Sequence, residues 1–74
     1  MGYDYSKLAG KIAEVFGTQA RFAEAVGLSE RSVSLKLNNK IGWKQAEMTK
    51  ACGVLGLDVA EVARYFFVPK VQNI

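Results

Sequence analysis

The stretch "TQARFAEAVGLSERSVSLKLNNK", Thr18–Lys40, contains two short apolar helical patterns separated by a Gly-Leu-Ser step. Phe22 and Val26 lie on one face of the first pattern, and Val33 and Leu37 anchor the second. Helices this short are marginal in isolation, so each needs the other and the rest of the chain for stability. Two such helices joined by a glycine-containing turn predict a helix-turn-helix.

Helical spacing and capping signals elsewhere predict three more helices around this pair. The expected helices are a first ending near Phe16, a second between Thr18 and Gly27, a third between Ser29 and Asn38, a fourth from about Lys44 to Leu55, and a fifth beginning at Asp58. The fold class is therefore all-α, a compact five-helix bundle in one domain, 1–74, with the motif at 18–38. We expect the tail 68–74 to be extended, either folded back on the bundle or paired with its counterpart across a two-fold axis.

Composition fits one small globular domain, because half of the 74 residues are hydrophobic and 23% are charged. The chain has one cysteine, Cys52, and no histidine, which excludes an intrachain disulfide and the usual zinc sites. We expect no metal and no cofactor. An enzyme is not expected either, since the sequence offers no histidine base, glycine-rich phosphate loop or paired-carboxylate motif.

Hydropathy gives no membrane signal. No signal-peptide pattern opens the chain, and no stretch approaches the roughly 18–20 apolar residues of a membrane span. The expected location is the cytoplasm, without a membrane partner.

The net charge of +3 is concentrated in one part of the chain. Residues 29–44 contain four basic residues and one acid, whereas the acids and bases of the remaining chain cancel. A localised basic patch is what phosphate binding requires. A solvated lysine-rich surface explains the same pattern equally well.

Aromatic residues gather near the two ends of the chain. Trp43, the single tryptophan, is expected to be a partly buried anchor at the core edge, and Cys52 a small core residue. Most of the tyrosines and phenylalanines near the ends should pack the termini onto the bundle. An exposed aromatic pair there would suit a dimer contact.

The motif resembles a known family at specific positions. These are Thr18, Gln19, Ala20, Ala23, Gly27, Val33 and Asn38. They resemble the helix-turn-helix pattern of the phage Cro and repressor class, the XRE-like family, and "MTKACGVLGLDVAEVARYFF" resembles the usual ending of that family. The resemblance covers about Leu8 to Phe67 and implies a lambda-repressor-like fold. The whole chain also resembles small temperate-phage regulators, both Cro-like DNA binders and antirepressors that modulate repression.

The resemblance implies DNA-contacting roles for residues of this motif. The base-facing set is Glu30, Arg31, Ser32, Ser34 and Leu35. The phosphate-contacting set is Gln19, Ser29, Lys36, Asn38, Asn39, Lys40 and Lys44. Glu30 departs from the family, which often has a neutral residue there, and three interpretations stay open. Its carboxylate accepts a hydrogen bond from cytosine N4, or it is simply a first-turn acid favoured by the helix dipole, or it marks a helix that meets an arginine-bearing protein surface.

Two functional hypotheses follow. The first is a Cro-like transcriptional regulator that binds double-stranded operator DNA through the third helix, as a homodimer. The alternative is an antirepressor that binds the DNA-binding domain of a phage repressor. Glu30, the low net charge and the family resemblance motivate this alternative.

Overall fold

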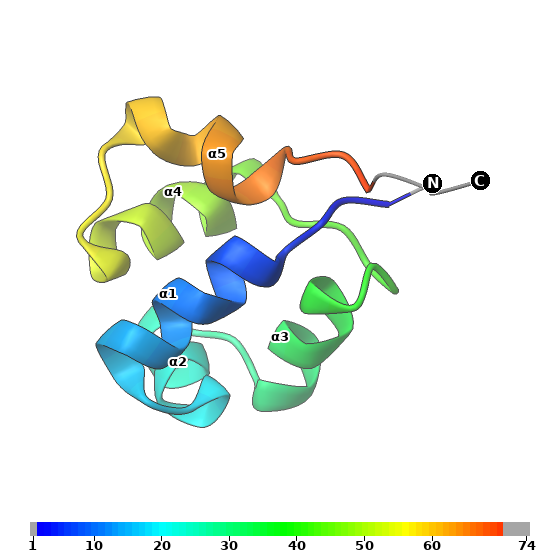
Figure 1. Cartoon of the computed structure of the whole chain (residues 1–74). Helices are drawn as coiled ribbons and strands as arrows, with labels where there is room; N and C mark the ends of the chain where they lie inside the picture. The colour runs from blue at the N-terminus through cyan, green and yellow to red at the C-terminus, as the bar shows by residue number, and fades with distance from the viewer. Residues whose placement is uncertain (1, 71–74) are drawn as a thin grey trace.

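The computed structural model describes residues 2–70, and helices make up about two thirds of them (Figure 1). The elements are α1 (Ser6–Phe16), α2 (Gln19–Val26), α3 (Glu30–Leu37), α4 (Gln45–Leu55), the 3-10 helix η1 (Val59–Glu61) and α5 (Val62–Phe66). The predicted all-α class with five α-helices is confirmed. None of the helices between residues 2 and 70 combines the length and the apolarity needed to cross a membrane.

The turn between α2 and α3 is fixed by the residues that the sequence singles out. The Thr18 hydroxyl accepts from the Arg21 backbone N–H at 3.2 Å and caps α2. The Ser29 hydroxyl accepts from the Ser32 N–H at 3.0 Å and caps α3. Between them, Gly27 ends α2 with a φ of 74°, a left-handed conformation that glycine adopts without strain.

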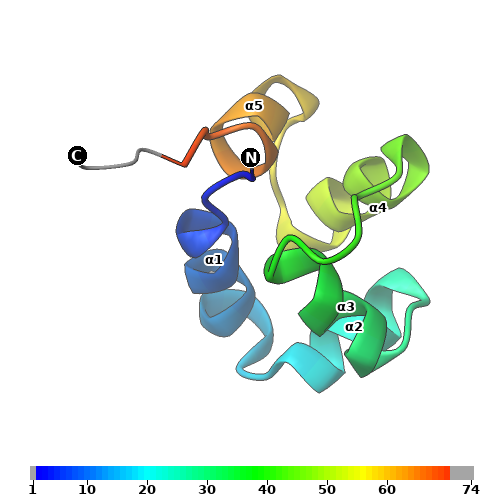
Figure 2. The same cartoon turned by 90° about the vertical axis from the view of Figure 1, so that its right-hand side faces the viewer.

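The core lies where α1, α2, α4 and α5 meet, and α3 packs against it from one side (Figures 1 and 2). Phe22 on α2 and Val33 on α3 are fully buried, as are Leu8 and Ile12 on α1 and Phe66 on α5. Burial of a side chain of this size contributes about 1.5–3 kcal/mol. Val33 therefore anchors α3 from beneath, as predicted, and leaves its opposite side to solvent.

The fifth helical segment differs from its sequence pattern, in which helical spacing predicts one apolar face made of Val59, Val62, Ala63 and Phe66. Asp58 opens it with the predicted capping contacts, accepting from the Ala60 N–H at 3.1 Å and donating its own N–H to Glu61 at 3.3 Å. The first turn is a 3-10 helix, however, with three residues per turn instead of 3.6. Because of this change of period, Val59 points to solvent and is 67% exposed, while Tyr65 is buried with the helix face.

The two ends of the described chain pair with each other. Tyr3 and Pro69 form an isolated antiparallel bridge. The Asp4 N–H donates to the Val68 carbonyl at 2.7 Å, and the Lys70 N–H donates to the Gly2 carbonyl at 3.2 Å. Residues 68–70 thus fold back on the chain's own N-terminal segment, one of the two arrangements predicted for the tail. The remainder of that predicted tail, 71–74, lies outside the described residues.

Candidate partner-binding surface on α3

An open groove lies between the start of α2 and the outer side of α3. It has a volume of about 490 Å³ and is lined by Gln19, Glu30, Arg31, Ser34 and Leu35. Four of the five residues predicted to face DNA bases are therefore neighbours on one surface, together with Gln19 from the first motif helix. Glu30 and Arg31 are exposed, and Ser34 and Leu35 are half-buried.

Ser32, the fifth residue of the predicted base-facing set, lies outside this groove. It is half-buried, and its hydroxyl lies 2.9 Å from that of Ser29, which donates to it. The Ser32 N–H donates to the same Ser29 oxygen, so both the backbone and the hydroxyl of Ser32 are engaged by the residue that caps α3. Ser29, predicted to touch a phosphate, is exposed and is engaged as the cap.

Lys36 does not point outward, and its prediction as an exposed phosphate contact is wrong. The residue is only 4% exposed. Its Nζ lies 2.8 Å from the Glu47 carboxylate, donates to the Gly42 carbonyl at 2.9 Å, and sits 5.8 Å from the centre of the Trp43 ring. The physical reason is helical spacing, because Lys36 is three residues after Val33 and falls on the buried side of α3.

Glu47, on the first turn of α4, is the partner that the sequence analysis missed. Burial by itself raises the pKa of this carboxyl, but hydrogen bonds from the Lys36 ammonium and the Lys44 backbone N–H, with the positive charges of both lysines, lower it overall. The Lys44 N–H bond is 2.8 Å long and caps α4, which lacked an evident cap in the sequence. One carboxylate therefore begins α4 and ties it to α3.

The far end of α3 is held by side-chain amides. Asn39 adopts a φ of 61°, and its amide accepts from the Tyr3 N–H and donates to the Tyr3 carbonyl, both at 2.9 Å. Asn38 donates to the Ser34 carbonyl at 2.8 Å. Both asparagines were predicted to contact phosphate, but here they hold the chain end and the helix end. Lys40 and Lys44 are exposed, as that prediction requires.

The burial of Lys36 changes the charge that α3 presents. The helix Glu30–Leu37 has three charged residues, and the third, Lys36, is buried against Glu47. The two exposed ones, Glu30 and Arg31, are of opposite sign. The outer surface of α3 is therefore electrically balanced, with Lys40 and Lys44 as exposed positive charges beyond its end.

Comparison with known proteins places this architecture in a family. Residues 1–69 match the family described as "Protein of unknown function (DUF739)". The chain belongs to this DUF739 family. A search of curated proteins gives no match.

Among solved structures, this DUF739 chain is similar to the modulator of repression (MOR) of the temperate bacteriophage TP901-1 from Lactococcus lactis, determined in solution. The two are 57% identical, the alignment covers 97% of each chain, and the TM-score is 0.79. The resemblance to the Cro and repressor class stays a prediction from the motif.

Proposed function

We propose that this DUF739 chain is a phage modulator of repression that acts as an antirepressor, by binding the DNA-binding domain of a phage repressor through the outer surface of α3. The 57% identity to a temperate-phage modulator of repression, over nearly the whole of both chains, supports the regulatory role. This was the alternative to operator binding in the sequence analysis, and the relative favours it over the first hypothesis.

The electrically balanced outer surface of α3 is the observation that carries the proposal. Affinity for DNA comes largely from lysines and arginines that neutralise phosphates. Here the helix offers Arg31 beside Glu30, and its one further base, Lys36, is held inside by Glu47. Paired charges of both signs are better suited to a protein surface, where complementary charges fix specificity and register.

The groove supplies the other elements of a protein contact. Leu35 is half-buried and adds an apolar surface next to the Glu30 and Arg31 charges, while Gln19 and Ser34 offer hydrogen-bonding groups. Occupation of the repressor's DNA-binding domain would lower its affinity for the operator. The encounter would take place in the cytoplasm of the infected host.

The test is a titration of the repressor encoded in the same phage genome, with operator affinity measured by fluorescence anisotropy as this chain is added. We expect a repressor–chain complex that forms without DNA and weakens operator binding at least tenfold. Arg31→Ala should reduce the effect, and Arg64→Ala, the same change at an exposed site on α5, should leave it intact. If operator affinity is unchanged with the chain in excess, the antirepressor proposal is wrong.

Operator binding is the second candidate, because Gln19 and Arg31 line one groove and Lys40 and Lys44 are exposed nearby. It would require a homodimer to reach two successive major grooves, about 34 Å apart. The chain alone would then shift operator DNA, with an affinity that falls steeply with salt concentration. A salt-insensitive or undetectable shift counts against it.

A further inference from the structure

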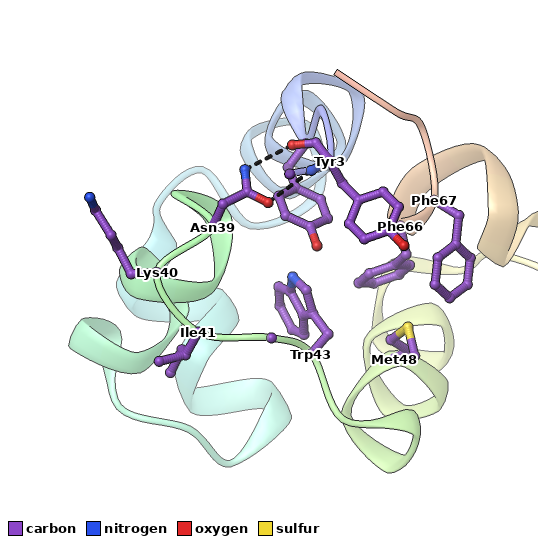
Figure 3. Close-up of a pocket in the computed structure, with 11 residues that line it drawn as sticks. Tyr3, Asn39, Lys40, Ile41, Trp43, Met48, Phe66 and Phe67 are labelled. Carbon is purple, nitrogen blue, oxygen red and sulfur yellow. Dashed lines mark hydrogen bonds between the residues drawn. The ribbon is translucent and has the colours of Figure 1, made fainter. Parts of the chain in front are cut away.

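A second hollow, of about 400 Å³, opens near the chain ends (Figure 3). It lies between the N-terminal segment, the loop that follows α3, the start of α4 and the end of α5, and we call it the aromatic pocket. The lining residues that matter here are Tyr3, Lys40, Ile41, Trp43, Phe66 and Phe67. Its volume falls in the range of about 300–1,000 Å³ that is usual for binding pockets.

Large apolar side chains lie at the rim of the pocket and are exposed to solvent, with Ile41 on the outer side of the loop (Figure 3). Tyr3 is 41% exposed, Ile41 43% and Phe67 45%. Tyr3 and Phe67 meet edge to face with ring centres 5.8 Å apart, which fixes both rings in place at one side of the pocket. Contiguous exposed apolar groups on a small protein mark an interaction site. The hydrophobic effect therefore favours covering this pocket with another apolar group.

The polar groups of the pocket indicate the chemistry of its occupant. Among the lining residues Lys40 carries the one charge and no acid is present. Its side chain extends from the rim away from the aromatic rings (Figure 3), so a carboxylate that pairs with it would lie beside the pocket and not inside it. The Trp43 Nε1 is a buried donor with no acceptor among residues 2–70. An unpaired buried donor is costly, which favours an occupant that also brings an acceptor oxygen. Since the nitrogen is out of reach of solvent, the side chains around it must shift for that oxygen to enter.

The pocket adjoins the surface already assigned to the repressor. The loop that forms one wall continues directly from α3, and the Lys40 and Ile41 N–H groups both bond back to the Leu35 carbonyl, at 2.9 and 3.4 Å. Figure 2 shows this loop between α3 and the N-terminal segment. A protein seated on α3 therefore lies close enough to extend into the aromatic pocket.

We infer that the aromatic pocket receives an apolar side chain of the phage repressor, flanked by a carboxylate that pairs with Lys40. This inference rests on the proposed function and adds a second contact to the α3 surface. The occupant is a protein segment, in which an apolar side chain, a main-chain carbonyl and a neighbouring Asp or Glu occur together. The pocket then contributes affinity and α3 contributes specificity.

The single tryptophan makes occupation of the pocket directly observable. In a chain labelled with ¹⁵N, Trp43 gives the one indole N–H signal, and an unlabelled repressor DNA-binding domain adds none. We expect this signal to shift as the repressor domain is added, saturating at the same ratio as the signals of α3. A complex in which the α3 signals shift and the indole signal does not would overturn the inference and leave the proposed function standing.

Matched variants test the rim. Ile41→Asp places a carboxylate where an acidic segment should dock, and we expect at least a tenfold loss of repressor affinity. Val59→Asp makes the same kind of change at a residue that is 67% exposed and outside the pocket, and should cost less than twofold. Equal affinities for the two variants would refute the inference.

Two other results would also count against the pocket. If the indole signal moves with the concentration of this chain alone, the occupant is a second copy of the chain, and the inference is wrong. If the wild-type chain does not bind the repressor at all, the proposed function fails and the inference fails with it.

Discussion

The buried ion pair between Lys36 and Glu47 leads to a quantitative prediction about stability. Glu47→Gln removes the carboxylate charge but keeps an oxygen that can accept from the Lys44 N–H, so the cap of α4 is retained. Lys36→Met removes the ammonium but keeps an apolar stem in the same space. The double variant replaces the whole pair, and the four proteins form a double-mutant cycle.

The expected magnitudes follow from the burial of the two side chains. Removing one member of a buried pair costs about 3–5 kcal/mol, because the remaining charge stays buried without its partner. The Lys36 side chain is 5% exposed and that of Glu47 is 16% exposed. We therefore expect about 3–4 kcal/mol for Glu47→Gln, which leaves the Lys36 ammonium hydrogen-bond acceptors but no counter-charge. We expect about 2–3 kcal/mol for Lys36→Met, which leaves Glu47 its bond from the Lys44 N–H and some water. The double variant should lose only about 1–2 kcal/mol.

Urea denaturation followed by circular dichroism at pH 7 measures these differences. A chain of this length is expected to have a stability of about 4–11 kcal/mol, so the losses in the single variants are a large fraction of the total and are readily measured. The cycle should give a coupling energy of about 3–6 kcal/mol. If each single variant loses less than about 1 kcal/mol of stability and the two losses simply add in the double variant, Lys36 is solvated. In that case α3 presents more positive charge than we infer.

Further predictions concern acidity, thiol reactivity, capping and the chain ends. The pKa of Glu47 is lowered from its ordinary 4.5, so the ionised carboxylate stabilises the fold above that pH, and this stabilisation is lost as the pH falls through the lowered pKa. In acid titrations of stability, Glu47→Gln should therefore show a smaller loss than the wild type. Burial and the charge of Glu61 raise the pKa of the Cys52 thiol, which is 1% exposed, and iodoacetamide at pH 8 should label the folded chain on the order of 100-fold more slowly than the urea-unfolded chain. Ser29→Ala should cost about 1 kcal/mol and lower the melting temperature by about 4–8 °C. Gly2→Ala would place a Cβ 2.7 Å from Asn39 Cγ, displacing that amide, and should cost about 1–2 kcal/mol in thermal unfolding.

Local signals made the helices predictable from the sequence. Thr18 and Ser29 cap their helices through hydroxyl groups that bond three residues ahead, and Gly27 supplies a left-handed turn. Such features depend on neighbours in the chain, and hydrophobic spacing adds the buried faces. The prediction that Val59 lies on the buried face was wrong for a local reason as well. Helical spacing assumes 3.6 residues per turn, whereas the capped first turn of this segment is a tighter 3-10 helix.

The candidate site was less predictable, because it depends on contacts between distant parts of the chain. A lysine is normally counted as solvated, and nothing within α3 identifies Glu47, eleven positions away, as the partner of Lys36. Lys36 lies three residues after Val33, which suits the buried side of α3, but it was predicted as an exposed phosphate contact because the spacing gives no acceptor for its charge. The aromatic pocket likewise joins Tyr3, Ile41 and Phe67 from three separate segments.

A single long-range contact therefore changes which partner the motif favours. Counting charges along the sequence gives residues 29–44 an excess typical of nucleic-acid binding, yet that count treats every base as accessible. Once Lys36 is paired inside the fold, the exposed charges of α3 balance. The helix keeps a shape that would enter a major groove, but it presents one base fewer to phosphates than its sequence suggests. This is why we propose that the same exposed groups contact another protein.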